Sequence, residues 1–358
     1  MPADRNDAAL ETLFLPFSED RLSWPAVAGG AIFLRARDGW PLHERPLPGL
    51  VCEQSFKPEA DALSLAGFAV NVTGAAETYE LVLILPPRQR DEARALMARA
   101  VAMTRPGGRI IVSQSNDEGA RSSESDLARL TGDVVSMSKN KCRVFWTESL
   151  ARLDVSLLTQ WQGLDAPRPI AEGRFMSRPG IFAWDRIDVA SALLAEHLPS
   201  SLTGRAADLG AGFGYLSAEL LTRCPGVTAL HAYEAENRAL ELARVNLKSF
   251  EARTPIDYRW HDVAAGLTDT YDVIVTNPPF HAQRGIDRPD IGRRFIAVAA
   301  DSLRPGGKLW LVANRHLPYE NALSESFDSV RTVVQRHGYK IIEAVRARSV
   351  RKAGKAPR

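Results

Sequence analysis

Short apolar runs alternate with amphipathic stretches along the second half of the chain. Five runs have the length and the apolar character of strands, and helical periodicity fills most of the gaps between them. The runs cover residues 205–209, 228–234, 256–260, 271–276 and 308–313. Strands that alternate with helices in this way are typical of an α/β fold with a parallel, doubly wound sheet.

The first half of the chain repeats part of this pattern. Tyr79 opens the run YELVLILPP, followed by a helix-like stretch and by RPGGRIIVSQSN; Tyr271 opens YDVIVTNPP, followed by a helix-like stretch and by RPGGKLWLVAN. In each copy we expect Arg-Pro-Gly-Gly to end a helix and turn the chain into a strand, because Pro stops a helix and Gly allows a positive φ. We interpret the chain as a tandem duplication of one fold.

Helix- and strand-breaking residues cluster between residues 163 and 180, which include three prolines and three glycines. We place the domain linker there and expect no helix or strand interior in it. A length of 358 residues, of which 45% are apolar, suffices for two cores. We therefore predict one domain at residues 1–165 and another at residues 166–358. The first copy has Leu85 where the second has Asn277, and lacks a glycine-rich turn, so we expect it to be catalytically empty.

Composition excludes several classes of protein. Charged residues make up 25% of the chain, with 45 Lys and Arg against 43 Asp and Glu, which excludes a disordered or collagen-like chain. No apolar run is long enough to span a membrane and no signal peptide is visible, so we expect a cytoplasmic protein. The three cysteines are far apart and form no C-x-x-C, so we expect reduced thiols and no metal site.

Positive charge is concentrated at the C-terminus. Residues 331–358 contain nine Lys or Arg and one Glu, although the net charge of the whole chain is +2. Such a basic tail favours a polyanionic partner. The alternative is a solvated terminus that only aids solubility.

A glycine-rich turn follows the strand at residues 205–209. Asp208 ends that strand, and Gly210, Gly212 and Gly214 follow it before a helix begins. Glycines let a ligand approach the backbone, and amides at the start of a helix offer hydrogen-bond donors. The spacing differs from the dinucleotide pattern G-x-G-x-x-G, and the acid would repel a phosphate, so a ligand that carries an ammonium group fits better. A tight turn without a ligand is the alternative.

Two further acids follow the next strands. Glu234 ends the second strand, where a carboxylate can accept hydrogen bonds from ribose hydroxyls, and Asp262 follows the third, where it can accept from an adenine amino group. Three acids at successive strand ends face one crevice in a doubly wound sheet. Purely structural roles remain the alternative, more so for Asp262 than for Glu234.

The combination of these motifs resembles a known family. The glycine motif together with Asn-Pro-Pro-Phe at 277–280 is similar to class I S-adenosylmethionine-dependent methyltransferases that act on exocyclic amino groups. The wider set, RPGIFAWDRIDVASALL, DLGAGFGYLS, NPPFH and ANRHLPY, resembles the bacterial ribosomal RNA guanine-N2 methyltransferases of the small subunit, strongly over residues 170–345. This resemblance implies two tandem Rossmann-like methyltransferase domains, the N-terminal one degenerate, with S-adenosylmethionine as the cofactor.

The residues of the Asn-Pro-Pro-Phe motif suit transfer to an exocyclic amino group. The lone pair of such an amine is delocalised into the ring, and two acceptors for its N–H bonds draw it towards tetrahedral geometry. Asn277 offers a side-chain oxygen, Pro278 offers a carbonyl in a stretch stiffened by Pro279, and Phe280 can stack on an extruded base. An ordinary turn is the alternative, and we interpret the adjacent His281 as solvated or structural.

Residues 178–188 precede the first strand of the second copy. The resemblance implies that this segment folds over the cofactor, with Phe182 and Asp188 at the pocket. From the residues alone it would be the end of a linker.

We therefore predict a monomeric enzyme that methylates N2 of a guanine in ribosomal RNA, in 16S RNA of the small subunit, acting on the RNA or on a ribosomal subunit. The N-terminal copy would serve RNA recognition and stability. The alternatives are a large-subunit guanine-N2 enzyme, an adenine-N6 enzyme, a release-factor glutamine-N5 enzyme and a non-catalytic RNA-binding assembly factor.

Overall fold

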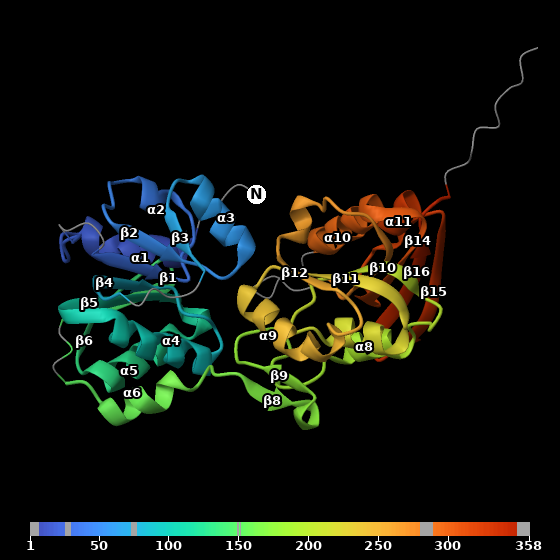
Figure 1. The fold of residues 1–358 in the computed structure, drawn as a ribbon. Helices are drawn as coiled ribbons and strands as arrows, with labels where there is room; N and C mark the ends of the chain where they lie inside the picture. Colours follow the sequence, from blue (N-terminus) through green and yellow to red (C-terminus); the bar gives the residue numbers. More distant parts are fainter. Residues whose placement is uncertain are drawn as a thin grey trace, which may run out of the picture. The chain divides into compact units, whose positions relative to one another are not determined.

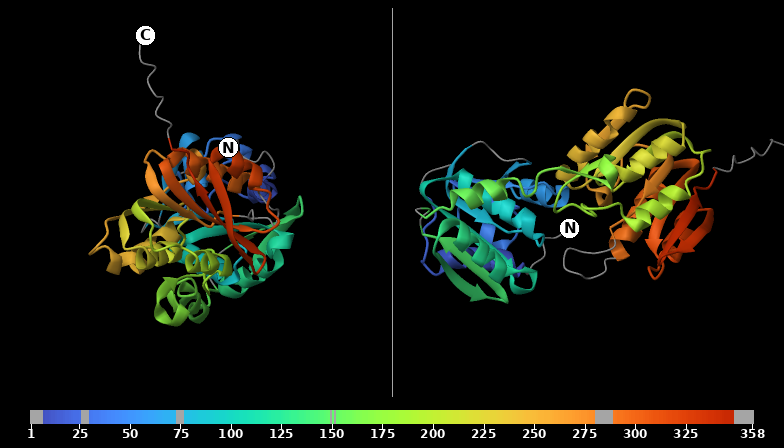
Figure 2. Two further views of the ribbon diagram at one scale, coloured as in Figure 1. Left: turned by 90° about the vertical axis from the view of Figure 1, so that its right-hand side faces the viewer. Right: turned by 90° about the horizontal axis from the view of Figure 1, so that it is seen from below.

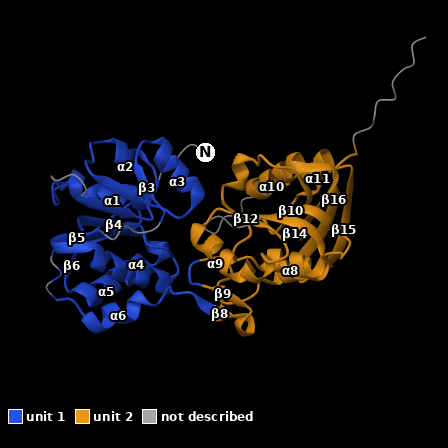
Figure 3. Cartoon of the chain, viewed as in Figure 1, with its two compact units in different colours: residues 1–168, 178–180 blue, residues 169–177, 181–358 orange. Residues whose placement is uncertain are grey.

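The computed structural model describes residues 7–25, 30–72, 77–148, 150, 152–279 and 289–348. It divides into two compact units, residues 1–168 with 178–180 and residues 169–177 with 181–358 (Figure 3). Each unit is an α/β sheet with helices on both faces (Figure 1).

The first unit contains a seven-stranded sheet in the order β3-β2-β1-β4-β5-β7-β6. Its strands are β1 (Ala31–Leu34), β2 (Leu50–Glu53), β3 (Ala69–Asn71), β4 (Tyr79–Ile84), β5 (Thr104–Ser115), β6 (Val134–Lys139) and β7 (Cys142–Thr147). Its helices are α1 (Ala8–Ser18), α2 (Trp40–His43), α3 (Lys57–Leu65), α4 (Arg90–Met103), α5 (Ala120–Thr131) and α6 (Val155–Gln162), with a 3-10 turn η1 (Asn116–Glu118).

The second unit repeats this topology in the order β12-β11-β10-β13-β14-β16-β15. Its strands are β10 (Thr203–Leu209), β11 (Gly226–Glu234), β12 (Ile256–Trp260), β13 (Tyr271–Thr276), β14 (Leu303–Asn314), β15 (Ser329–Arg336) and β16 (Tyr339–Val345). Its helices are α7 (Val189–Glu196), α8 (Tyr215–Arg223), α9 (Asn237–Leu247), α10 (Pro289–Ser302) and α11 (Glu320–Ser326), with 3-10 turns η3 (Lys248–Phe250) and η4 (Val263–Ala265).

In both sheets the first five strands pair in parallel, and the two remaining pairs at the end of each sheet are antiparallel. The antiparallel edge of the second sheet is formed by the red strands that lie side by side in Figure 2. The five strands expected in the second half match β10 to β14, and the expected duplication appears as two sheets of one strand order. The predicted fold class of two tandem Rossmann-like domains is confirmed.

The helices of the second unit form two layers. On one face, α10 and α11 pack on Ala207 and Leu209 of β10. On the other, α7 and α8 pack on Ala206 and on Trp310 of β14, which is 2% exposed. Alternate residues of a strand point to opposite faces, so each of these strands is apolar on both sides. The parallel strands therefore bring their carboxyl ends to one buried edge, where the loops that follow them meet.

Two local expectations need correction. Residues 163–180 were expected to contain no strand, but β8 (Arg168–Ile170) and β9 (Phe175–Ser177) form a two-stranded ribbon in this stretch, joined by the 3-10 turn η2 (Ala171–Gly173). Gly173 has a φ of 84°, so this helix- and strand-breaking residue lies in the turn that reverses the chain between β8 and β9.

The Arg-Pro-Gly-Gly segments do not separate a helix from a strand but belong to the strands. In β14 the register steps from Tyr271↔Leu303 to Val273↔Lys308, so the four residues bulge out of the ladder. Gly107 and Gly306 both have a φ of 80°, which a bulge of this kind requires.

The strand registers of the two sheets match, and they identify the residue of the first unit that corresponds to Asp208. Leu34 pairs with Ile84 in the first sheet as Leu209 pairs with Thr276 in the second, so Phe33 corresponds to Asp208. Phe33 is fully buried against the aromatic side of α1. In the first unit this position therefore belongs to the hydrophobic core.

We predict that Phe33→Asp lowers the free energy of unfolding of the first unit by at least about 3 kcal/mol, because it removes a core ring and buries a charge. Urea unfolding followed by near-ultraviolet circular dichroism measures this. Leu65→Asp, at a side chain that is 90% exposed, is the control and should change the value by less than about 0.5 kcal/mol. Equal stability of Phe33→Asp and the wild type would contradict the assignment of Phe33 to the core.

Candidate functional site

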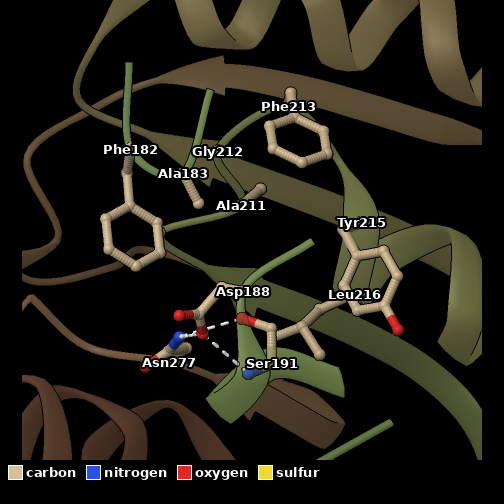
Figure 4. Close-up of a pocket in the computed structure, with 11 residues that line it drawn as sticks. Phe182, Ala183, Asp188, Ser191, Ala211, Gly212, Phe213, Tyr215, Leu216 and Asn277 are labelled. Carbon is tan, nitrogen blue, oxygen red and sulfur yellow. Dashed lines mark hydrogen bonds between the residues drawn. The ribbon is translucent and has the colours of Figure 1, made fainter. Parts of the chain in front are cut away.

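A cavity opens at the carboxyl edge of the second sheet. It lies within one unit and is bordered by the segment before α7, the turn after β10, the start of α8 and the residue after β13 (Figure 4). Its lining residues are Phe182, Ala183, Asp188, Ser191, Gly210, Ala211, Gly212, Phe213, Tyr215, Leu216 and Asn277. None of these described lining residues is basic, and one, Asp188, is an acid. Such a lining disfavours a phosphate and suits a ligand that carries positive charge.

The turn after β10 is built from backbone groups. Gly210 and Gly212 have φ values of 78° and 56°, a region that favours glycine, and a Cβ added to Gly212 would meet no atom within 4 Å. The amides of Gly210 and Ala211 both donate to the carbonyl of Tyr233 at 2.9 Å, which ties the turn to β11. The open side of Gly212 therefore lets a ligand approach the backbone.

Gly214 has another role. It caps α8 at a φ of 92° and an added Cβ would lie 3.3 Å from Ala243 of α9. Two of the three predicted glycines thus line the cavity, whereas Gly214 serves the packing of α8 on α9. Asn246 of α9 supports the same turn, because its side-chain amide donates to the carbonyls of Phe213 and of Met176 in β9.

Asp208 is fully buried and does not line the cavity. Its Oδ2 accepts a hydrogen bond from the hydroxyl of Ser217 at 2.7 Å, and its Oδ1 is buried without a hydrogen-bond partner among the described residues. Burial, with a smaller contribution from the charge of Glu234, raises the pKa of Asp208 to about 7, although the bond from Ser217 opposes this. Strand alternation explains the placement: Ala207 and Leu209 face α10, so Asp208 faces α8.

Glu234 lies directly behind the glycine turn. Its two carboxylate oxygens accept from the amides of Gly212 and Glu236, each at 2.8 Å. Burial raises the pKa of Glu234, and the two amides counteract the rise. Asp262 is half-buried and caps η4 through a 2.9 Å bond from the amide of Ala264. Neither acid borders the cavity, so their predicted contacts with a ribose and an adenine stay predictions.

The segment before α7 contributes two predicted residues. Phe182 borders the cavity with 69% of its surface exposed. Asp188 caps α7, its Oδ2 accepting from the amide of Ser191 at 2.8 Å. The structure brings both residues to the cavity, as Figure 4 shows. Whether they contact a cofactor stays a prediction.

Asn277 follows β13 and contacts Asp188 directly (Figure 4). Its Nδ2 donates to Asp188 Oδ2 at 3.0 Å and to Ser191 Oγ at 2.9 Å. Its Oδ1 is buried without a hydrogen-bond partner among the described residues. Pro278 is buried and Pro279 is exposed, whereas Phe280 and His281 lie outside the described residues.

Sequence reasoning missed the two serines of this site. Ser191 and Ser217 lie on α7 and α8, three and nine residues after the acids that they contact. Serines are common on helices and carry no motif of their own. The only available signal for Ser191 was its place three residues after an aspartate, which is the spacing of a helix cap.

Further observations concern metals and membranes. In the part of the chain that the structure describes, no three His, Cys, Asp or Glu side chains gather in a way that could hold a metal ion. Among the same residues no helix is both long and apolar enough to cross a membrane. The three cysteines are buried and form no disulfide.

We predict that Asp208→Asn gains stability relative to the wild type as the pH rises from 5 to 8. Because the pKa of Asp208 is raised in the folded state, the folded protein binds a proton that the unfolded chain releases above pH 4, so its contribution to stability falls with rising pH. An asparagine has no such dependence and can still accept from Ser217. Thermal unfolding of both proteins across this pH range measures the difference, and a difference that does not change with pH would contradict the raised pKa.

The comparisons with known proteins agree with this geometry. Residues 172–343 match the family model of the methyltransferase small domain. Ribosomal RNA small subunit methyltransferase C of Psychromonas ingrahamii is 27% identical over 271 residues, which cover 75% of this chain and 76% of that protein. The same enzyme of Shewanella loihica is 29% identical over 273 residues, covering 74% and 77%.

A solved structure has the same fold. The Thermus thermophilus 16S rRNA N2 G1207 methyltransferase RsmC, in complex with AdoMet and guanosine, superposes with a TM-score of 0.78 at 24% identity and covers 96% of this chain and 94% of that one. The resemblance predicted from the motifs is confirmed. The match to the methyltransferase small domain is confined to residues 172–343, and the chain is similar, over about three quarters of its length, to the small-subunit ribosomal RNA methyltransferases C.

Proposed function

We propose that this protein transfers a methyl group from S-adenosylmethionine to the exocyclic N2 of a guanine in ribosomal RNA, and that the RNA is the 16S RNA of the small subunit. One observation carries the proposal. Asn277, whose side chain carries a hydrogen-bond acceptor and which follows β13, lines the same cavity as the glycine turn after β10. A methyl donor held by the turn and an amine held by the asparagine would therefore meet in one place.

The residues of the cavity fit the proposed cofactor. S-adenosylmethionine supplies a methyl group activated by its sulfonium charge when it is bound. The acid and the absence of basic side chains among the described lining residues suit a ligand with positive charge, and Gly212 leaves its backbone open to it. Glu234, fixed behind the turn, is the group that would accept from the ribose hydroxyls, and Asp262 from the adenine amine. The Thermus thermophilus relative was solved with AdoMet and guanosine, which supports the same assignment.

The protein contributes positioning and hydrogen bonding. Asn277 Oδ1 accepts one N–H of the guanine amine and the carbonyl of Pro278 accepts the other, which frees the nitrogen lone pair for an in-line approach to the methyl group. Both acceptors bind more strongly as positive charge develops on nitrogen, so they favour the transition state over the ground state. The nitrogen carries a positive charge directly after transfer and is therefore acidic, so it loses a proton to solvent and no strong base is needed. Phe280 would stack on the extruded base.

The first unit does not carry this chemistry. At the positions that match Asp208, Gly210, Glu234 and Asn277 it has Phe33, Arg35, Gln54 and Leu85. Both polar atoms of the Gln54 side chain have a backbone partner, since its nitrogen donates to the carbonyl of Ala36 and its oxygen accepts from the amide of Phe56. We assign this unit, and the basic C-terminal residues, to recognition of ribosomal RNA and to stability. We propose that the protein acts in the cytoplasm as a monomer.

Asn277→Ala tests the function directly. We expect a fall in kcat/KM of about 10²–10³-fold, because a preorganised acceptor of the reacting amine is lost. The measurement is transfer of labelled methyl to separated small and large ribosomal subunits and to their deproteinised RNA, followed by nucleoside mass analysis. N2-methylguanosine in small-subunit RNA is the expected product.

Asn321→Ala, at an exposed asparagine of α11, is the matched control and should keep wild-type transfer. Label in large-subunit RNA would show that the target lies in the large subunit. N6-methyladenosine as the product would show that the methylated base is adenine. Transfer only to a protein would favour the glutamine-N5 alternative. Full activity of Asn277→Ala would refute the proposed role of that residue.

A further inference from the structure

The side-chain amide of Asn277 is held in one orientation by two partners on and before α7. Its nitrogen has two hydrogens, and each has an acceptor: Asp188 Oδ2 at 3.0 Å and Ser191 Oγ at 2.9 Å. Asp188 and Ser191 lie 89 and 86 residues earlier in the chain than Asn277. The three side chains converge in Figure 4.

The chemistry of Asp188 fixes which end of the amide faces it. An ionised carboxylate only accepts hydrogen bonds, so the amide must present its nitrogen to Asp188, and a flipped amide would set two oxygens against each other. The amide oxygen of Asn277 therefore points away from α7. It is the buried Oδ1 that has no hydrogen-bond partner among the described residues.

Asp188 is itself held in place. Its Oδ2 also accepts from the amide of Ser191 at 2.8 Å, as the cap of α7. The cap positions the carboxylate, and the first turn of α7 brings the Ser191 hydroxyl to the second hydrogen of Asn277. The start of α7 thus supplies both acceptors, Asp188 and Ser191, and Asn277 in the loop after β13 supplies the donor.

We propose that Asp188 and Ser191 are positioning residues for transfer: they lock Asn277 so that its Oδ1 accepts from the substrate amine. The inference rests on the function proposed above and goes beyond the predicted contact of Asp188 with the cofactor. A free amide could present its nitrogen to the amine, where two donors would meet and nothing would draw the lone pair out. The negative charge of Asp188 also polarises the amide, which makes Oδ1 a stronger acceptor as charge develops on the substrate.

The first test is a double-mutant cycle on transfer. Ser191→Ala removes one acceptor but keeps the cap, which uses the backbone amide, and should lower kcat by about tenfold with the affinity for S-adenosylmethionine unchanged within about twofold. Asp188→Asn keeps a capping side chain and removes the charge, and should lower kcat further. Both changes should have no further effect, within about twofold, in an Asn277→Ala protein, because their target is gone.

Controls separate positioning from folding and from cofactor binding. Asp328→Asn makes the same change of side chain at an exposed aspartate that follows α11, outside the cavity, and should keep wild-type kcat. Losses that add fully to that of Asn277→Ala would overturn the proposal. The proposal would also be overturned if Asp188→Asn weakened the affinity for S-adenosylmethionine and left kcat unchanged, because Asp188 would then act by binding the cofactor.

The second test does not depend on activity. In an NMR spectrum of the side-chain amides, the pair that disappears in Asn277→Ala should exchange slowly with water in the wild type, and Ser191→Ala should speed exchange of one hydrogen. Fast exchange of both in the wild type would overturn the network whatever the enzyme does. If the wild type methylates no RNA while exchange is slow, the proposed function fails, and the catalytic purpose of the network fails with it.

Discussion

The turn after β10 constrains everything else in the catalytic unit. The chain must leave a buried parallel strand, reverse and start α8 within a few residues, and it must leave room for a ligand at the reversal. Gly210 and Gly212 make this possible with positive φ values, and the carbonyl of Tyr233 together with the carboxylate of Glu234 binds three successive amides of the turn. Because β11 and β13 both run parallel to β10, the loops that follow them lie at the same edge of the sheet as the glycine turn.

The cost of this arrangement is visible in its buried acids. Asp208 and Glu234 are held where burial opposes their charged forms, and only a few hydrogen bonds compensate. The first unit has the same topology without buried charges at these two positions. Phe33, an aromatic residue, replaces Asp208, and Gln54, a neutral amide, replaces Glu234. The two units share one strand order and differ in the side chains at their strand ends, and the proposed function assigns the chemistry to the second unit alone.

The sequence predicted the fold well because its signals are local. Apolar runs, the repeated Arg-Pro-Gly-Gly segments and the glycine spacing each depend on a few adjacent residues, and they led to the strands, the duplication and the turn. The orientation of Asp208 was less accessible, because it depends on which helix covers each face of β10. The hydrogen bonds of Asn277 to Asp188 and Ser191 could not be predicted, because both partners lie more than 80 residues away and the cap spacing links them only to each other. The ribbon of β8 and β9 was missed because its breakers form the reversal between two short strands.

Under the proposed function only the second unit binds the cofactor, and calorimetric titration of the whole protein with S-adenosylmethionine tests this most directly. We predict one site per chain, and we predict that Gly212→Val abolishes it, because a branched side chain is strained at a positive φ and would fill the open side of the turn. Two sites per chain, or a single site that survives Gly212→Val in a folded protein, would contradict the account.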